Sequence, residues 1–193
     1  MKRISVRRPS GALLTIGLLG AGAFAFAGPA AAEQERLGAT AAEITAEFQN
    51  GKMSFEGPKT VPAGSNLRIV NNTDPQQIGP HTISFTKKRL IPNTRAEMRA
   101  CGRGQLRICR KIIKPHKANP ETGQVDRVVV ERGKVGWNQL FSRKRQGDSW
   151  FTETQNEEHT RRVSAVAGKV LPFFCVVHPD MQGKIKVVPA PIE

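Results

Sequence analysis

Hydrophobic residues alternate with polar ones in several short segments of the chain, which Gly, Pro and Asn residues separate. Alternation with a period of two predicts strands that bury one face, and the separating residues predict tight turns. The predicted strands cover residues 43–48, 52–57, 65–71, 80–86, 162–168, 170–177 and 183–189. Short strands at this spacing are typical of an all-β fold in which two sheets pack face to face.

A long basic segment, residues 87–158, interrupts this pattern. Within it, residues 93–114 predict one or two short helices, because Asn93 or Thr94 can cap a helix and the glycines at 102 and 104 can end one. Residues 124–133 predict a further strand. We therefore interpret residues 87–158 as an insertion between two strands of the sandwich.

The first 32 residues have the pattern of a cleaved export signal. Four basic residues precede an apolar run at residues 12–28, and small residues at 30–32 suit cleavage. A retained membrane anchor is the alternative, but the run is rich in Gly and Ala, and Glu33 follows it closely. The pair Arg7-Arg8 leaves the general and the twin-arginine export routes open.

The remaining chain is expected to lie in the periplasm or the extracellular space, with no transmembrane segment. Residues 33–42 are small and polar without a clear period, so we predict a flexible leader there. The sandwich domain is predicted to span residues 43–189, insertion included, and residues 190–193 to form a tail.

Positive charge is concentrated in one part of the chain. The full chain has 30 Lys and Arg and 16 Asp and Glu. The predicted signal holds four of the basic residues and no acidic residue, so the exported chain carries a net charge of +10. Residues 87–162 alone hold 19 basic and 8 acidic residues. Such a segment can steer the protein to an acidic partner or form a solvated cationic face. Nucleic acid is not an expected ligand, because the protein is exported and lacks an RNA-binding or helix-turn-helix signature.

Three cysteines, an odd number, leave one thiol unpaired if the other two form a disulfide. Cys101 and Cys109 lie close together in the basic segment, and an oxidising compartment favours a disulfide between them. A second metal site is the alternative, although no histidine lies between them and the intervening residues are basic. A free thiolate at Cys175 survives best if a metal occupies it.

The main chemical motif is a thiolate, an imidazole and a thioether within seven residues: Cys175, His178 and Met181. A loop that leaves one strand at the cysteine and enters the next near Lys184 can turn all three side chains toward one point. A thiolate and two imidazoles in a plane, with a weak axial thioether, form the blue-copper electron-transfer site. The second imidazole must come from elsewhere in the chain.

The loop CVVHPDMQGKIKV resembles that of the cupredoxins, most closely the amicyanin and plastocyanin group, in its ligand spacing, in the Pro after the histidine and in the Gly-Lys before the last strand. The element GPHTISF is similar to the first-histidine motif of that family and puts His81 in the ligand position. The resemblance covers residues 43–86 and 163–189 and implies a cupredoxin-like Greek-key β-sandwich. His81 and Cys175 are 94 positions apart, more than is usual in the family, which favours a true insertion between them.

The resemblance implies one copper ion held by His81, Cys175, His178 and Met181, with Met181 as the weak axial ligand. It implies a monomeric one-electron carrier that exchanges electrons with a redox protein, and the basic segment suggests that this partner has an acidic docking surface. Copper storage, delivery or sensing without redox cycling is the alternative. Catalysis is not expected, because the four histidines form no His-x-His pair of the kind that multicopper oxidases need. His116 and His159 receive no role, except that His159 is the alternative ligand to His81.

Overall fold

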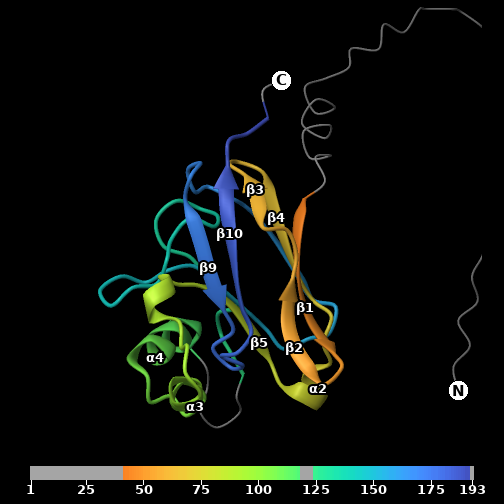
Figure 1. Ribbon diagram of the computed structural model, residues 1–193, viewed down its shortest axis with the longest axis vertical. Coiled ribbons are helices and arrows are strands. Elements are labelled where there is room, and N and C mark those ends of the chain that lie inside the picture. Colours follow the sequence, from red (N-terminus) through yellow and green to blue (C-terminus); the bar gives the residue numbers. More distant parts are fainter. Residues whose placement is uncertain (1–40, 118–123, 192–193) are drawn as a thin grey trace, which may run out of the picture. The chain divides into compact units, whose positions relative to one another are not determined.

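The computed structural model describes residues 41–117 and 124–191 of the chain (Figure 1). The predicted export signal, nearly all of the predicted leader and the last two residues of the predicted tail lie outside the described residues. In the described part, no helix is both long enough and apolar enough to cross a membrane.

Two β-sheets form the body of the protein, so the predicted all-β sandwich is confirmed. The four-stranded sheet contains, in order, β2 (Lys52–Glu56), β1 (Ala42–Gln49), β4 (Asn66–Asn71) and β8 (Glu158–Arg162). The six-stranded sheet contains β3 (Thr60–Pro62), β10 (Gln182–Val188), β9 (Val170–Phe174), β5 (His81–Phe85), β7 (Ser149–Thr152) and β6 (Val129–Val130).

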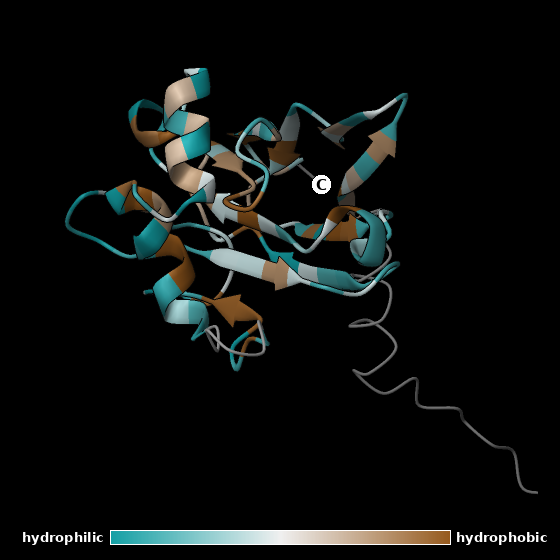
Figure 2. Cartoon of the chain, turned by 90° about the horizontal axis from the view of Figure 1, so that it is seen from below, coloured by the Kyte–Doolittle hydropathy of each residue, from teal (hydrophilic) through white to brown (hydrophobic). Residues whose placement is uncertain are grey.

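The helices predicted within the basic segment are also present. Thr94 caps α3 in a reciprocal arrangement with Glu97, which is the capping box. The described helices are α2 (Pro75–Ile78), α3 (Arg95–Gly102) and α4 (Arg107–Ile113), with 3₁₀ turns η1 (Lys88–Leu90) and η2 (Lys114–His116). Hydrophilic and hydrophobic residues alternate along helices and strands in Figure 2, as expected for elements with one buried face.

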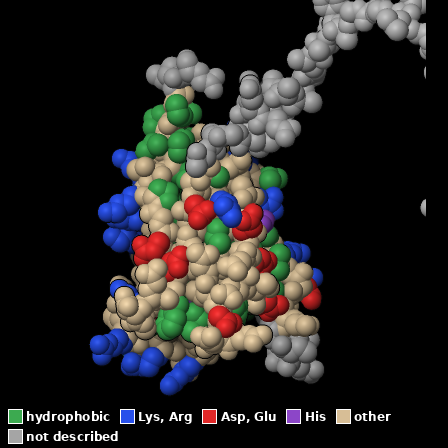
Figure 3. Space-filling model, turned by 90° about the vertical axis from the view of Figure 1, so that its right-hand side faces the viewer, with side chains coloured by type: hydrophobic (Ala, Val, Ile, Leu, Met, Phe, Trp, Pro, Cys, Tyr) green, Lys and Arg blue, Asp and Glu red, His purple; other side chains and the backbone are tan. Residues whose placement is uncertain are grey.

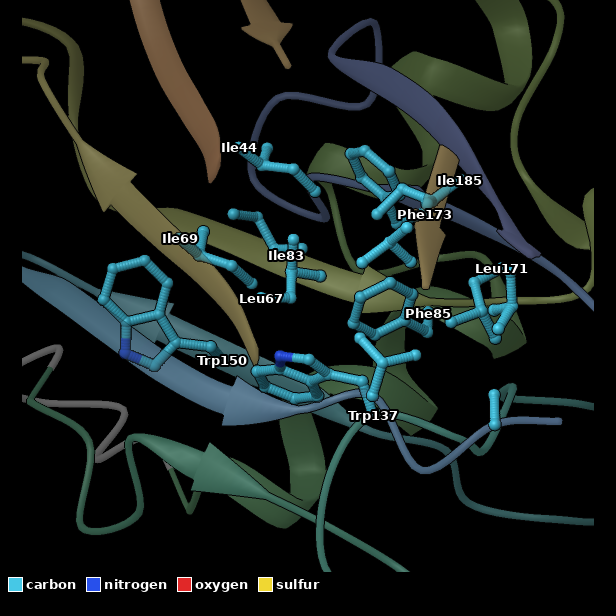
Figure 4. Packing of buried hydrophobic residues seen from close by; sticks show 14 residues of the cluster. Ile44, Leu67, Ile69, Ile83, Phe85, Trp137, Trp150, Leu171, Phe173 and Ile185 are labelled. Carbon is cyan, nitrogen blue, oxygen red and sulfur yellow. The ribbon is translucent and has the colours of Figure 1, made fainter. Parts of the chain in front are cut away.

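The main core lies between the two sheets (Figure 4). Phe85 of β5 is at its centre, with ring centroids 5.3 Å from Trp137 and 5.8 Å from Phe173. In β10, Ile185 and Val187 point into this core while Lys184 and Lys186, which alternate with them, are exposed, as the sequence predicts.

Strand β5 is buried on both faces. Ile83 and Phe85 face the main core, whereas Thr82 and Ser84 are buried on the other side. A second hydrophobic cluster includes residues of α3, α4 and β9, so the helices of the basic segment pack against the six-stranded sheet. This cover turns the polar face of β5 into a second interior.

Two strand predictions are wrong in position. The strand expected at residues 162–168 is instead β8, which ends at Arg162. Arg162 lies opposite Asn66, the first residue of β4, so β8 ends where its partner strand begins. Beyond that point Trp137 of the 136–138 loop donates its backbone N–H to the Arg162 carbonyl and accepts the Ala165 N–H. The strand expected at residues 124–133 consists of two residues, β6.

Candidate metal centre

Three side chains that the sequence singles out meet at one end of the sandwich. His81 begins β5, Cys175 follows β9, and His178 lies in the loop between β9 and β10. The Cys175 Sγ atom is 3.9 Å from His81 Nδ1 and 3.8 Å from His178 Nδ1. The two Nδ1 atoms are 3.2 Å apart, and each residue thus offers one donor atom to a common centre.

Sheet pairing brings His81 to the loop across 94 positions of sequence. Strand β9 runs antiparallel to β5, with Ser84 opposite Phe174, so the start of β5 meets the end of β9. Two hydrogen bonds then close the loop: Cys175 N–H donates to the Met181 carbonyl at 3.0 Å, and Met181 N–H donates to the His178 carbonyl at 2.9 Å. The ligand loop, residues 175–181, is therefore held at both its ends.

Met181 lies in the same part of the molecule as the three donors. Its side chain is buried and packs in a small cluster with Cys175 and Ala46 of β1. The four-stranded sheet thus contributes the wall against which the thioether rests.

Burial sets the protonation of the two imidazoles. Burial, together with the charge of His178, lowers the pKa of His81 to about 4. Burial also lowers the pKa of His178, opposed by a hydrogen bond with the Ile78 backbone and by the charge of Asp180. Both rings are therefore neutral near pH 7 and have a lone pair to give a metal.

For the thiol, burial disfavours the deprotonated form that binds a metal. Burial raises the pKa of Cys175 above its ordinary value, although the Thr82 and His178 backbone N–H groups each lie 3.3 Å from Sγ and favour the thiolate. A bound cation supplies the compensating charge that such a thiolate needs.

The donor set and its spacing fit a metal ion. Metal–nitrogen and metal–sulfur bonds are about 2.0–2.3 Å, so three donors around one ion in a plane lie about 3.5–3.8 Å apart. The three measured separations, 3.2, 3.8 and 3.9 Å, are close to this spacing. One soft sulfur and two imidazoles suit copper or zinc and disfavour Mg²⁺ or Ca²⁺.

Thr82 is part of the site, and the sequence analysis did not single it out. Its hydroxyl accepts the Val176 N–H at 2.8 Å, its backbone N–H lies 3.3 Å from the Cys175 sulfur, and its backbone and side chain both lower the pKa of the thiol. Thr82 therefore ties the ligand loop to β5. A polar residue between His81 and the buried Ile83 was the available signal.

The predicted disulfide between Cys101 and Cys109 is present and joins α3 to α4. Cys101 Sγ lies 3.6 Å from the carbonyl oxygen of Val176, the residue after Cys175. The disulfide therefore supports the helices at the point where they touch the ligand loop.

The other two histidines lie outside the cluster. His159 stacks on Trp150 with ring centroids 6.0 Å apart, and its Nε2 accepts a hydrogen bond from Arg161. His116 is buried, with one ring nitrogen 2.7 Å from the Arg127 carbonyl and the other 2.9 Å from Ser149 Oγ. His81, and not His159, is thus the imidazole that faces Cys175 and His178.

Comparison with models of known protein families finds no match, and comparison with curated proteins finds none either. Among solved structures, the chain is similar to Na-dithionite reduced auracyanin from the photosynthetic bacterium Roseiflexus castenholzii. The two share 18% sequence identity with a TM-score of 0.40, over 76% of this chain and 95% of that chain. At this level of similarity, the residues of the site must be judged from their own geometry.

Proposed function

We propose that this chain is an exported blue-copper protein of the cupredoxin type that carries one electron at a time between redox proteins. His81, Cys175 and His178 would hold the copper ion in a plane, with Met181 as a weak axial ligand. The observation that supports this most directly is the approach of His81 Nδ1, His178 Nδ1 and Cys175 Sγ to within 3.9 Å of one another. The ligand spacing of the loop favours the amicyanin and plastocyanin group.

Copper supplies the one-electron chemistry when it is bound, and the protein supplies a rigid and dry set of donors. His81, Cys175 and Met181 are buried, and hydrogen bonds fix the loop that holds three of the four ligands. Donors that are already in place need to move little when the charge of the site changes. Nothing in this arrangement requires a bound substrate or a proton donor, so we propose a carrier and not an enzyme.

His178 is the proposed point at which electrons enter and leave. Its ring is partly exposed, whereas the other three ligands are buried. Gly79, at the end of α2, lies beside the ring, since a Cβ there would be 4.0 Å from His178 Cε1. A partner that docks over α2 and the ligand loop would therefore reach the ring edge directly.

A basic groove beside the ligand loop is the proposed docking aid. Two adjoining hollows share Arg89 and Arg143, and Pro92 in the first of them accepts a hydrogen bond from Gln182, which directly follows the loop. In Figure 3, by contrast, acidic side chains gather on the face in view and most Lys and Arg lie along its margins. The basic residues that line the groove are Lys87, Arg89, Arg107, Lys111, Arg143, Lys144, Arg145 and Lys169.

This groove suits an acidic redox partner, because opposite charges speed the encounter and weak docking lets the carrier leave after each transfer. We expect the rate of electron transfer to such a partner, for a monomeric carrier, to fall as salt is added. Arg143→Glu should lower the rate at low salt, and Lys52→Glu, an exposed charge on β2 outside the groove, should have a smaller effect. A rate that does not depend on salt would exclude this docking mode.

Copper storage, delivery or sensing is the second candidate, and the donor types favour it. A thiolate and a thioether are soft ligands that prefer Cu(I), and both belong to buried side chains here. A protein with this role would bind Cu(I) but would not form a stable Cu(II) species.

The test is a titration of residues 33–193 with Cu(II), followed by visible absorption and electron spin resonance. An intense blue band with narrow copper hyperfine splitting is expected, and Cys175→Ser should abolish it. His159→Gln is the matched control and should leave the spectrum unchanged, because that ring packs on Trp150 away from the cluster. A pale Cu(II) spectrum that does not depend on Cys175 would refute the proposal of an electron carrier.

A further inference from the structure

A row of buried polar side chains runs from the basic segment to the candidate thiolate. His116 Nε2 lies 2.9 Å from Ser149 Oγ, which lies 2.8 Å from Ser84 Oγ. Ser84 donates to Thr82 Oγ1 at 3.2 Å, and Thr82 lies against the candidate thiolate: its backbone N–H is 3.3 Å from the Cys175 sulfur, and its side chain lowers the pKa of that thiol. All these residues are buried, so water does not compete for their hydrogen bonds.

The protons in this row can be counted. Each hydroxyl has one proton to donate, and a carbonyl accepts only. Because Ser84 donates to Thr82, Ser149 must donate to Ser84 and must itself accept from His116 Nε2–H. His116 Nδ1 also carries a proton, since its partner at 2.7 Å is the Arg127 carbonyl. The full row pointing toward the sulfur thus requires His116 with both nitrogens protonated.

When His116 is neutral, the hydrogen bonds that join it to Ser149 and Ser84 point in the opposite direction. Its Nδ1–H stays on the Arg127 carbonyl, so Nε2 becomes an acceptor and takes the proton of Ser149. Ser149 then accepts from Ser84, whose only proton turns away from Thr82. Thr82 Oγ1 loses a donor, and the stabilisation that Thr82 gives the thiolate weakens because neighbouring hydrogen bonds polarise one another.

We propose that His116 is a positioning residue for the candidate copper site, which sets the direction of the hydrogen bonds through Ser149 and Ser84 and thereby tunes the Cys175 thiolate. The inference rests on the proposed function, because it assigns a role to this thiolate as a copper ligand. Hydrogen bonds to the cysteine sulfur are one of the factors that set the potential of such a site.

The surroundings of His116 allow it to change its proton. Burial, and to a smaller degree the charge of Arg127, lowers its pKa below 6.5, while the hydrogen bond with the Arg127 backbone raises it. From β7 it meets uncharged Ser149 and Phe151, and β6 contributes two valines. The charges nearest in sequence on η2 and α4 are exposed or partly exposed cations, and Asp126 beside Arg127 is exposed. The ring is therefore neutral at pH 7 and becomes a cation in acid.

The first test follows the copper-loaded protein as the pH falls through the His116 transition. A stronger hydrogen bond withdraws charge from the sulfur, so the sulfur-to-copper absorption band should move to higher energy. The equilibrium between Cu(II) and Cu(I) should shift toward Cu(I) by about threefold to tenfold, the tenfold value being about 59 mV for one electron.

Two variants should remove this pH-dependent step in absorption and in the Cu(II)/Cu(I) equilibrium, for different reasons. The amide of His116→Gln can donate to Arg127 and accept from Ser149 but cannot ionise, so it fixes the arrangement seen at high pH. Ser149→Ala leaves the histidine in place and cuts the row. His159→Gln is the control, since burial also lowers the pKa of that histidine but its ring lies outside the row, and the step should remain. A step that persists in both His116→Gln and Ser149→Ala overturns the proposal.

The second test uses metal-free protein and does not depend on copper. Nitrogen-15 NMR should find His116 protonated at Nδ1 near pH 7 and at both nitrogens in acid. The amide proton of Val176 shares the Thr82 oxygen at 2.8 Å, so its chemical shift should follow the His116 titration and should stop following it in Ser149→Ala. A Val176 amide shift that does not change as His116 titrates would overturn the proposed role of His116. A shift that does change, in a protein that forms no blue copper spectrum, would refute only the proposal of an electron carrier.

Discussion

Three of the four proposed ligands can bind a proton, so the binding of Cu(I) should release protons in a number that depends on pH. Burial raises the pKa of Cys175, lowers that of His178, and lowers that of His81 to about 4. At pH 7.5 the metal-free site therefore holds one proton, on the sulfur. Because the thiolate is the form of Cys175 that would bind copper, one proton should leave for each Cu(I) bound.

The number of protons released determines how the affinity for Cu(I) depends on pH. Around neutral pH, each unit of acidification should weaken binding about tenfold, which is about 1.4 kcal/mol. Below the pKa of His178 the loss should approach about a hundredfold per unit, since two protons then compete. Below about pH 4 the His81 ring also takes a proton, and three protons must leave.

The measurement is Cu(I) competition against a chelator of known affinity without oxygen, from pH 5 to 8.5, with proton release recorded by base titration at fixed pH. Cys175→Ser should release no proton at pH 7.5, and His159→Gln should behave as the unchanged protein. Release of two or more protons at pH 7.5 would show that a ligand imidazole is charged in the metal-free protein. Release of none would show that the sulfur is already a thiolate or is not a ligand.

Three further predictions concern stability in urea. Burial lowers the pKa values of all four histidines, so the stability of the metal-free protein should be highest above pH 6.5 and should fall toward pH 4. His81 should account for up to about 3 kcal/mol of this loss. A urea midpoint that is constant over this pH range would contradict the prediction. Replacement of both Cys101 and Cys109 by alanine should cost about 2–3 kcal/mol, because their cross-link closes a short loop with a separation of 8 residues; an unchanged midpoint would be the contrary result. Phe85→Ala should cost about 3–5 kcal/mol, whereas Phe48→Ala, whose ring is 45% exposed, should cost much less, and equal losses would contradict the assigned core.

The sequence by itself determined the part of the site that is local. Cys175, His178 and Met181 lie within seven residues between two predicted strands, so the chain between them cannot separate them far. Alternation likewise predicted strands such as β4 and β10, because one face of each is buried and the other is more exposed. The capping box at Thr94 and the nearby pair Cys101 and Cys109 are short-range features of the same kind.

The tertiary structure decided everything that depends on which distant segments pair. His81 reaches the ligand loop through the register of β5 with β9, and a residue 94 positions away has no local constraint that would place it there. The strand expected at 162–168 fails for the same reason, since its partner β4 begins opposite Arg162 and the next residues hydrogen-bond to a distant loop at Trp137. Thr82 and Ser84 look like the solvent face of a strand in sequence, and they are buried because the helical segment covers them. Alternation records how many faces of a strand are apolar, but it cannot record that a polar face is enclosed and joined to a buried histidine such as His116, because that depends on packing between elements far apart in the chain.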